Sequence, residues 1–295
     1  MFSFPLSHFF RPGHLPEKEQ SIHFERFARL GLTDLTLTST QCERLLETPE
    51  YLEFLVREQQ RNGLRFLNAH APYGERFDLN CTDTFSRRMR EAQRRIFNCC
   101  ARLGIETITL HIGNNDSGLP LDQLRAQAAR ALEILLPEAE KCALTLLIEN
   151  TLFPTDTPAE LIGYLEKFPT PTLGICFDAG HANVMDAAPG KRSGQLIDWI
   201  RNRWVPEVRF EVDTLAALLP HTVSCHLHDN HGFNDEHLIP GDGTIDWNRL
   251  FSRLAAEAPR LRSVQNETNS EMFRIAPERM AERFRKLREL PSAGA

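Results

Sequence analysis

The sequence lacks long apolar runs and an excess of positive charge. No run approaches the roughly 20 apolar residues that a membrane span requires, and the N-terminus "MFSFPLSHFFRPGH" has no basic leader followed by an apolar stretch. The formal net charge of -6 provides no broad attraction to nucleic acid or to an anionic membrane. We therefore expect a cytoplasmic protein with no membrane partner and no nucleic-acid partner, acting on a small molecule.

Two sequence motifs are also missing. The 7 cysteines are odd in number and include no C-x-x-C pair, so we expect them to be reduced and structural. No G-x-G-x-x-G follows a predicted strand, which argues against a dinucleotide-binding open sheet. Because no low-complexity segment or long linker divides the chain, we expect one domain over residues 1–295.

Short apolar runs rich in β-branched and aromatic residues alternate with stretches of helical periodicity. The predicted strands cover residues 2–7, 33–38, 64–70, 106–111, 144–150, 172–178, 222–228 and 263–267. Helices are predicted at 84–104, 121–142, 247–256 and 277–290, with Gly104 ending the first and Asp246 capping the third. This alternation favours an α/β fold, a single-domain TIM (β/α)8 barrel, with a doubly wound sheet as the alternative.

The region between strands six and seven is longer than the others. Between Asp186 and Pro220, the segment "AAPGKRSGQ" is followed by a helical stretch, "LIDWIRNRWVPEV". We interpret it as an enlarged loop region within the same domain.

Six successive predicted strands end in, or close to, a side chain that can bind a metal. These residues are His70, His111, Glu149, Asp178, His226 and Glu267. Any one of them alone would have a structural explanation, as a hydrogen-bonded histidine or as a helix cap. Together they would meet at the rim of a barrel, where carboxylates repel one another unless a cation neutralises them. A divalent metal is therefore the simplest explanation.

Two local spacings extend this candidate site. In "DAGH", Asp178 and His181 are three residues apart at a strand-to-helix turn, so both can approach one ion. In "DEH", Asp235 and His237 are two apart, and in an extended loop both side chains would point the same way. We interpret His228 and His231 as supporting or loop residues. Imidazole with carboxylate suits zinc, manganese or iron, and disfavours calcium.

As an ordered set, the motifs "HAPYG", "LHIG", "IENT", "CFDAGH", "HLHDNHG", "DEHLIPGDGTIDW" and "NET" resemble the xylose isomerase-like TIM barrel superfamily. That superfamily contains sugar and sugar phosphate isomerases and epimerases, and the type 2 AP endonucleases. The resemblance is detailed from His70 to Trp247 and follows strand order elsewhere. In the sugar branch it implies one ion held by Glu149, Asp178, His226 and Glu267. In the endonuclease branch it implies three zinc ions, with His70, His111, His181, Asp235 and His237 as further ligands.

The two branches imply different chemistry. In an isomerase, Glu149 and Glu267 would be catalytic and move a proton, and the five further residues would bind substrate hydroxyls. In a phosphodiesterase, the metals would activate water, with Glu149 bridging ions and Glu267 orienting the water. The segment "HAPYGERFDLN" is more similar to the sugar branch, and we interpret the arginine run within residues 87–95 as a solvated helix face.

We therefore predict a divalent-metal-dependent isomerase or epimerase of a sugar or sugar phosphate, acting in carbohydrate metabolism. The alternatives are a zinc-cluster hydrolase of the AP endonuclease type and a non-catalytic metal- or ligand-binding barrel. The sequence leaves open the substrate, the metal (zinc, manganese or similar), the number of ions from one to three, and association into a homo-oligomer.

Overall fold

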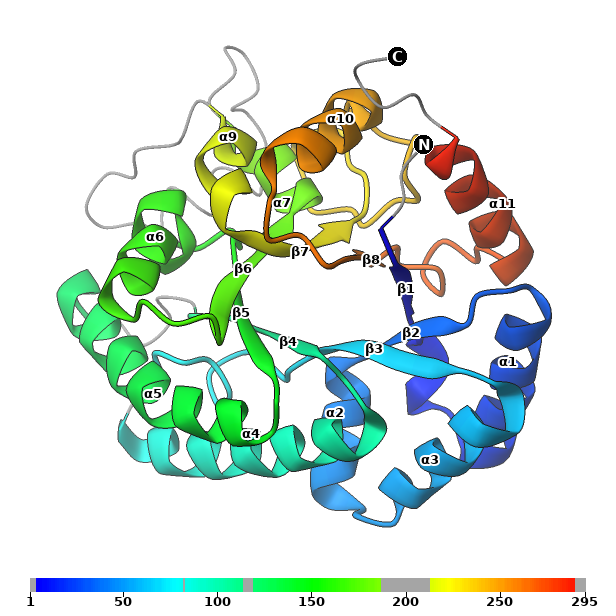
Figure 1. The fold of residues 1–295 in the computed structure, drawn as a ribbon, viewed down its shortest axis with the longest axis horizontal. Coiled ribbons are helices and arrows are strands. Elements are labelled where there is room, and N and C mark those ends of the chain that lie inside the picture. Colours follow the sequence, from blue (N-terminus) through cyan, green and yellow to red (C-terminus); the bar gives the residue numbers. More distant parts are fainter. Residues whose placement is uncertain (1–3, 82, 114–118, 187–212, 290–295) are drawn as a thin grey trace.

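The computed structural model describes residues 4–81, 83–113, 119–186 and 213–289 of the 295-residue chain. Its strands form a closed parallel barrel in chain order, with the helices on the outside (Figure 1). The barrel closes through β1 and β8, where Leu6 pairs with Val264. The strands are β1 Leu6–Phe9, β2 Asp34–Leu37, β3 Arg65–His70, β4 Thr107–Leu110, β5 Thr145–Glu149, β6 Leu173–Asp178, β7 Thr222–Leu227 and β8 Ser263–Asn266. The predicted TIM barrel is confirmed.

The helices surround the barrel and cover its apolar outer surface. They are α1 Glu17–Arg29, α2 Ser39–Glu47, α3 Tyr51–Asn62, α4 Asp83–Leu103, α5 Leu121–Lys141, α6 Pro158–Lys167, α7 Ala179–Met185, α9 Thr214–Leu218, α10 Trp247–Glu257 and α11 Pro277–Arg288. Short 3-10 turns are η1 Arg11–His14, η2 Pro154–Asp156 and η3 Leu219–His221. As predicted, Gly104 follows α4 with a φ of 74°, and the Asp246 side chain caps α10 by accepting the Arg249 N–H at 3.0 Å.

One prediction of local structure, the position of the first strand, differs from the fold. Another, the enlarged loop, falls mostly on residues outside the described ranges. The first strand is Leu6–Phe9 and not residues 2–7. Pro5 has no N–H to donate, so the strand begins after it and ends two residues later than expected. This shift brings Arg11 close to the end of β1. The two quoted segments of the enlarged loop lie at residues 187–208, outside the described residues.

Other features match the expectations. In the arginine run, Arg87, Arg88, Arg94 and Arg95 lie on the exposed face of α4 and Arg90 is half-buried, and all seven cysteines are free. Among the helices that the structure describes, none combines the length and hydrophobicity that crossing a lipid bilayer requires.

The interior of the barrel is more polar than the apolar strand pattern suggests. Asn68 lies at its centre, buried, and accepts a hydrogen bond from Ser7 Oγ at 2.7 Å. Its Nδ2 donates to Thr107 Oγ1 at 2.7 Å and to Ser263 Oγ at 2.9 Å. The network continues around the barrel through further buried side chains, which are Thr36, Ser224 and Gln265. These hydrogen bonds join strands β1, β2, β3, β4, β7 and β8. Because every link is buried, removal of one partner leaves buried polar atoms unpaired, which is costly.

We expect Asn68→Ala to lower the free energy of unfolding by about 2–4 kcal/mol, because it removes hydrogen bonds to three buried hydroxyls and leaves a cavity. Urea denaturation of the purified protein measures this. Asn98→Ala is the control: Asn98 is exposed on α4 and donates only to the Arg94 carbonyl among the contacts described. Equal losses in the two variants would contradict a stabilising polar layer.

Candidate metal centre

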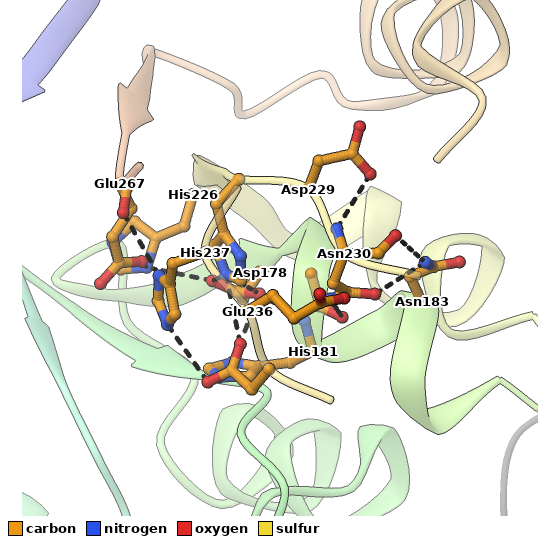
Figure 2. A network of polar contacts seen from close by, with 12 residues as sticks. Asp178, His181, Asn183, His226, Asp229, Asn230, Glu236, His237 and Glu267 are labelled. Carbon is orange, nitrogen blue, oxygen red and sulfur yellow. Dashed lines mark hydrogen bonds and ion pairs between the residues drawn. The ribbon is translucent and has the colours of Figure 1, made fainter. Parts of the chain in front are cut away.

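The nine predicted site residues converge at the carboxyl-terminal mouth of the barrel. Strand ends carry six of them, α7 carries His181, and the loop after β7 carries Asp235 and His237. Seven of the nine residues line a cavity of about 520 Å³. These seven are His70, His111, Glu149, His181, Asp235, His237 and Glu267. Asp178 and His226 lie beside them and are fully buried. Figure 2 shows Asp178, His181, His226, His237 and Glu267 turned toward one another.

The central set consists of Glu149, Asp178, His226 and Glu267, and all four side chains are buried. His226 Nδ1 is the common neighbour of the three carboxylates. It lies 3.2 Å from Glu149 Oε1, 3.5 Å from Asp178 Oδ2 and 3.0 Å from Glu267 Oε2. The ends of β5, β6, β7 and β8 therefore bring one imidazole and three carboxylates together, as the strand order predicted.

A second set, which consists of His70, His111 and Glu149, adjoins the first through Glu149, and His70 also groups with His226 and Glu267 of the central set. His70 Nε2 lies 3.4 Å and His111 Nε2 lies 3.2 Å from Glu149 Oε2. His70 Nδ1 is 2.8 Å from the Ala71 carbonyl, which can only accept, so Nδ1 carries the hydrogen. In the neutral ring this leaves the lone pair on Nε2, which faces Glu149 and is suited to hold a metal.

The third set, called the loop set here, consists of His181, His228, Asp235 and His237. Asp235 Oδ2 lies 3.3 Å from His181 Nε2 and 3.1 Å from His237 Nε2. The expectation of an extended loop is wrong at His237, whose φ of 53° is left-handed. Asp235 and His237 still meet because the turn folds His237 back, with its Nδ1 3.2 Å from the Glu267 carbonyl.

The two remaining histidines of the β7 loop differ. His228 is buried, and its Nε2 lies 3.0 Å from Asp178 Oδ2, so it holds a carboxylate of the central set. Gly180 makes room for it, because a Cβ there would collide with the His228 ring. His231 is exposed and pairs with Glu236 at 2.9 Å, as a loop residue.

Sequence reasoning missed the residues that anchor this loop. Buried Asp229 accepts hydrogen bonds from Gly241 N at 2.7 Å, Trp247 Nε1 at 2.9 Å and Ile245 N at 3.2 Å. Asn230 connects the loop to α7, since its Nδ2 donates to the Gly180 carbonyl at 2.8 Å. Figure 2 shows Asp229 and Asn230 beside the metal-binding candidates. The contacts with Gly241, Trp247 and Gly180 span 12 or more residues of sequence, so in the sequence only the position of Asp229 and Asn230 next to His228 pointed to them.

Arg11 was also missed. It lines the cavity from the end of β1, together with Tyr73 and Asn269. The first strand was expected to end at Ser7, which left Arg11 outside the predicted rim. A basic residue just beyond the actual strand end was the signal in the sequence.

Electrostatics keep these carboxylates ionised despite burial. Burial alone would raise the pKa of Glu267, but the nearby His226 outweighs it and lowers that pKa to about 2. Burial would also raise the pKa of Glu149, but the nearby His226, His111 and His181 outweigh burial and hold that pKa well below its usual value. Burial would lower the pKa of His237, and its hydrogen bond to Asp235 instead raises it to about 9. Since coordination requires a deprotonated imidazole nitrogen, a metal ion would compete with these protons.

The spacing and chemistry of the donor atoms could hold a metal ion. Zinc bonds of about 2.0–2.2 Å place tetrahedral donors roughly 3.3–3.6 Å apart, close to the 3.0–3.5 Å separations around His226. Glu149 Oε2, Glu267 Oε2 and His181 Nδ1 are buried without an aligned hydrogen bond, although each has a donor or acceptor close by. Such unpaired buried atoms are costly unless a ligand engages them. The mixture of nitrogen and oxygen donors suits zinc or manganese.

Two sequence relatives are uncharacterized proteins. One, from Sinorhizobium fredii, is 28% identical over 90 residues, which are 30% of this chain and 22% of that protein. The other, from Methanocaldococcus jannaschii, is 22% identical over 219 residues, which are 70% of this chain and 66% of that protein. The chain thus spans 22% and 66% of the length of the curated relatives that it matches.

Several solved structures share the fold. A 3-keto-D-glucoside 4-epimerase from E. coli superposes with a TM-score of 0.69 at 16% identity, covering 97% of this chain and 100% of that one. A D-psicose 3-epimerase from Clostridium cellulolyticum superposes with a TM-score of 0.71 at 12% identity, covering 97% of this chain and 99% of that one. A Thermus thermophilus protein soaked with ZnCl2 superposes with a TM-score of 0.65 at 22% identity, covering 98% of this chain and 99% of that one.

A family model described as xylose isomerase-like TIM barrel matches residues 24–290. That match spans β2 to β8 and every residue of the three donor sets. The chain belongs to the xylose isomerase-like TIM barrel family.

Proposed function

We propose that this protein is a divalent-metal-dependent isomerase or epimerase of a small sugar or sugar phosphate, with Glu149 and Glu267 as the proton-transferring residues. One observation carries the proposal. Both carboxylates border the same cavity, and each lies within 3.2 Å of His226 Nδ1, so they flank one point from different strands. The epimerases among the solved structures that share this barrel support the same chemistry.

The cavity suits a monosaccharide. Its volume of about 520 Å³ lies within the range of small-molecule sites. Five further residues line the cavity and can hydrogen-bond substrate hydroxyls. They are His70, His111, His181, Asp235 and His237. We propose residues 1–295 as the extent of the catalytic domain.

The central set would hold the ion, which when bound would polarise a carbonyl oxygen of the sugar. Glu149 or Glu267 accepts the proton from the neighbouring carbon, which general-base catalysis requires to be within hydrogen-bond reach. Delivery of the proton to the former carbonyl carbon, while the neighbouring hydroxyl loses its proton and becomes the new carbonyl, gives isomerisation. Delivery of a proton to the original carbon from the opposite carboxylate gives epimerisation. Tyr73, Leu152 and Phe153 enclose the cavity and limit the access of water to the reacting carbon.

A phosphodiesterase of the AP endonuclease type is the second candidate, and one observation favours it. The three donor sets are continuous: Glu149 belongs to two of them, and His181 Nδ1 lies 3.3 Å from both Glu149 Oε1 and Asp178 Oδ1. A reaction that uses one ion does not require the second and third sets. With several ions, activation of water and binding of phosphate oxygens become possible.

One experiment separates the two functions. The protein, purified without added metal, is analysed for bound ions and incubated with a panel of ketoses and aldoses in deuterated water, with an abasic-site DNA duplex assayed in parallel. We expect about one ion per chain and deuterium at the carbon next to the carbonyl, detected by NMR. Two or three zinc ions with strand cleavage and no exchange would identify the hydrolase instead. Bound metal with neither activity would indicate a non-catalytic barrel.

A further inference from the structure

Arg11 places a fixed cationic group at the rim of the cavity. Its Nη2 donates to the Glu267 carbonyl at 2.7 Å, and its Cζ lies 5.1 Å from the centre of the Phe9 ring. These two contacts hold the guanidinium in one orientation, between β1 and the end of β8. No lysine and no second arginine is found among the described residues that line the cavity.

The charge of Arg11 has no counterion in the described parts of the chain. No carboxylate oxygen there lies within 4.0 Å of its guanidinium, and its Nε is buried without a hydrogen-bond partner. Arg44 is a useful contrast, because it also donates to a carbonyl, at Leu15, and stacks on an aromatic ring, that of Tyr51. Unlike Arg11, Arg44 has a carboxylate partner, Glu17, at 3.5 Å, and it does not line the cavity.

A partly buried guanidinium without a counterion is unfavourable, whereas one that meets a carboxylate or phosphate forms strong, charge-assisted hydrogen bonds. The planar fork of arginine is suited to such groups, and less suited to neutral hydroxyls. Asn269, two residues after Glu267, also lines the cavity, and a side-chain amide can donate to an anion. The cavity therefore provides one wall for a negatively charged group, next to the carboxylates of the metal centre.

We propose that Arg11 binds an anionic group of the substrate, so that the substrate is an acidic sugar, either a sugar phosphate or a sugar acid. This inference rests on the proposed function and narrows its substrate class. Arg11 acts in substrate selection and takes no part in proton transfer.

The test compares binding of three probes by calorimetry: D-fructose, D-fructose 6-phosphate and D-fructuronate. We expect the wild-type protein to bind one acidic probe roughly 10–100-fold more tightly than D-fructose. Arg11→Gln should reduce this preference to about twofold or less without changing the affinity for D-fructose. Arg44→Gln, the matched control, should retain the wild-type preference for the acidic probe over D-fructose. Preference for the phosphate alone identifies a sugar phosphate, and preference for the uronate alone identifies a sugar acid.

Equal binding of neutral and acidic probes by the wild-type protein, or an unchanged preference in Arg11→Gln, would overturn the inference. So would failure of all three probes to bind. Failure of the proposed function has a different signature, which is an Arg11-dependent preference without deuterium exchange into any bound sugar.

Discussion

Glu149→Gln is expected to reduce hydrogen exchange into the sugar by about 10²–10⁴-fold, the usual contribution of a general acid or base. Glutamine keeps the shape of the side chain but cannot accept the proton. The effect should exceed that of Glu267→Gln, because the Glu149 carboxylate lies within 3.4 Å of four imidazoles, those of His70, His111, His181 and His226. Among the described residues, the Glu267 carboxylate pairs with one imidazole, that of His226, at 3.0 Å. Deuterium incorporation followed by NMR, together with metal analysis of the same samples, measures both roles.

The matched control is Glu236→Gln. Glu236 lies in the β7 loop and pairs with exposed His231, and it belongs to none of the donor sets found among the described residues. Its exchange rate should remain within about twofold of wild type, since substitutions away from such sites are usually close to neutral. Exchange at the wild-type rate in Glu149→Gln would remove this residue from the catalytic pair.

Asp178→Asn is expected to weaken metal binding at the central set by at least about 100-fold, because even supporting residues of metal sites contribute 10–100-fold. Asp178 is fully buried, and its carboxylate lies 3.0 Å from His228 Nε2 and 3.3 Å from His181 Nδ1. Asparagine retains the helix cap, in which Asp178 Oδ1 accepts the His181 N–H at 2.6 Å. The fold should therefore persist while the negative charge is lost.

Competition with a chelator of known affinity measures this change, and circular dichroism tests whether the fold persists. Asp246→Asn is the control, since Asp246 caps α10 in the same way but lies in none of the donor sets. If Asp178→Asn bound metal as tightly as Asp246→Asn, Asp178 could not be a ligand.

Local patterns in the sequence predicted the barrel and the nine candidate residues. Apolar runs and helical periodicity reflect which face of each element is buried, and these patterns are visible among residues that are neighbours along the chain. Strand ends such as His70, Glu149 and Asp178 could be identified because parallel strands of one barrel all open on the same rim. The spacing of "DAGH" likewise placed His181 beside Asp178, and the two side chains are 3.3 Å apart.

Only the tertiary structure decided which residues surround these candidates. Asn68 looked like part of an apolar strand, yet its partners Ser7 and Ser263 come from opposite ends of the chain. Asp229 anchors the β7 loop through two backbone N–H groups, which carry no residue-specific signal, and through the side chain of Trp247, 18 residues away. Closure of β1 against β8 brings Arg11 to the carbonyl of Glu267, 256 residues away. Contacts of this kind depend on how the barrel closes, and closure has no local signature because hydrogen bonds and charges act across space, independently of distance along the chain.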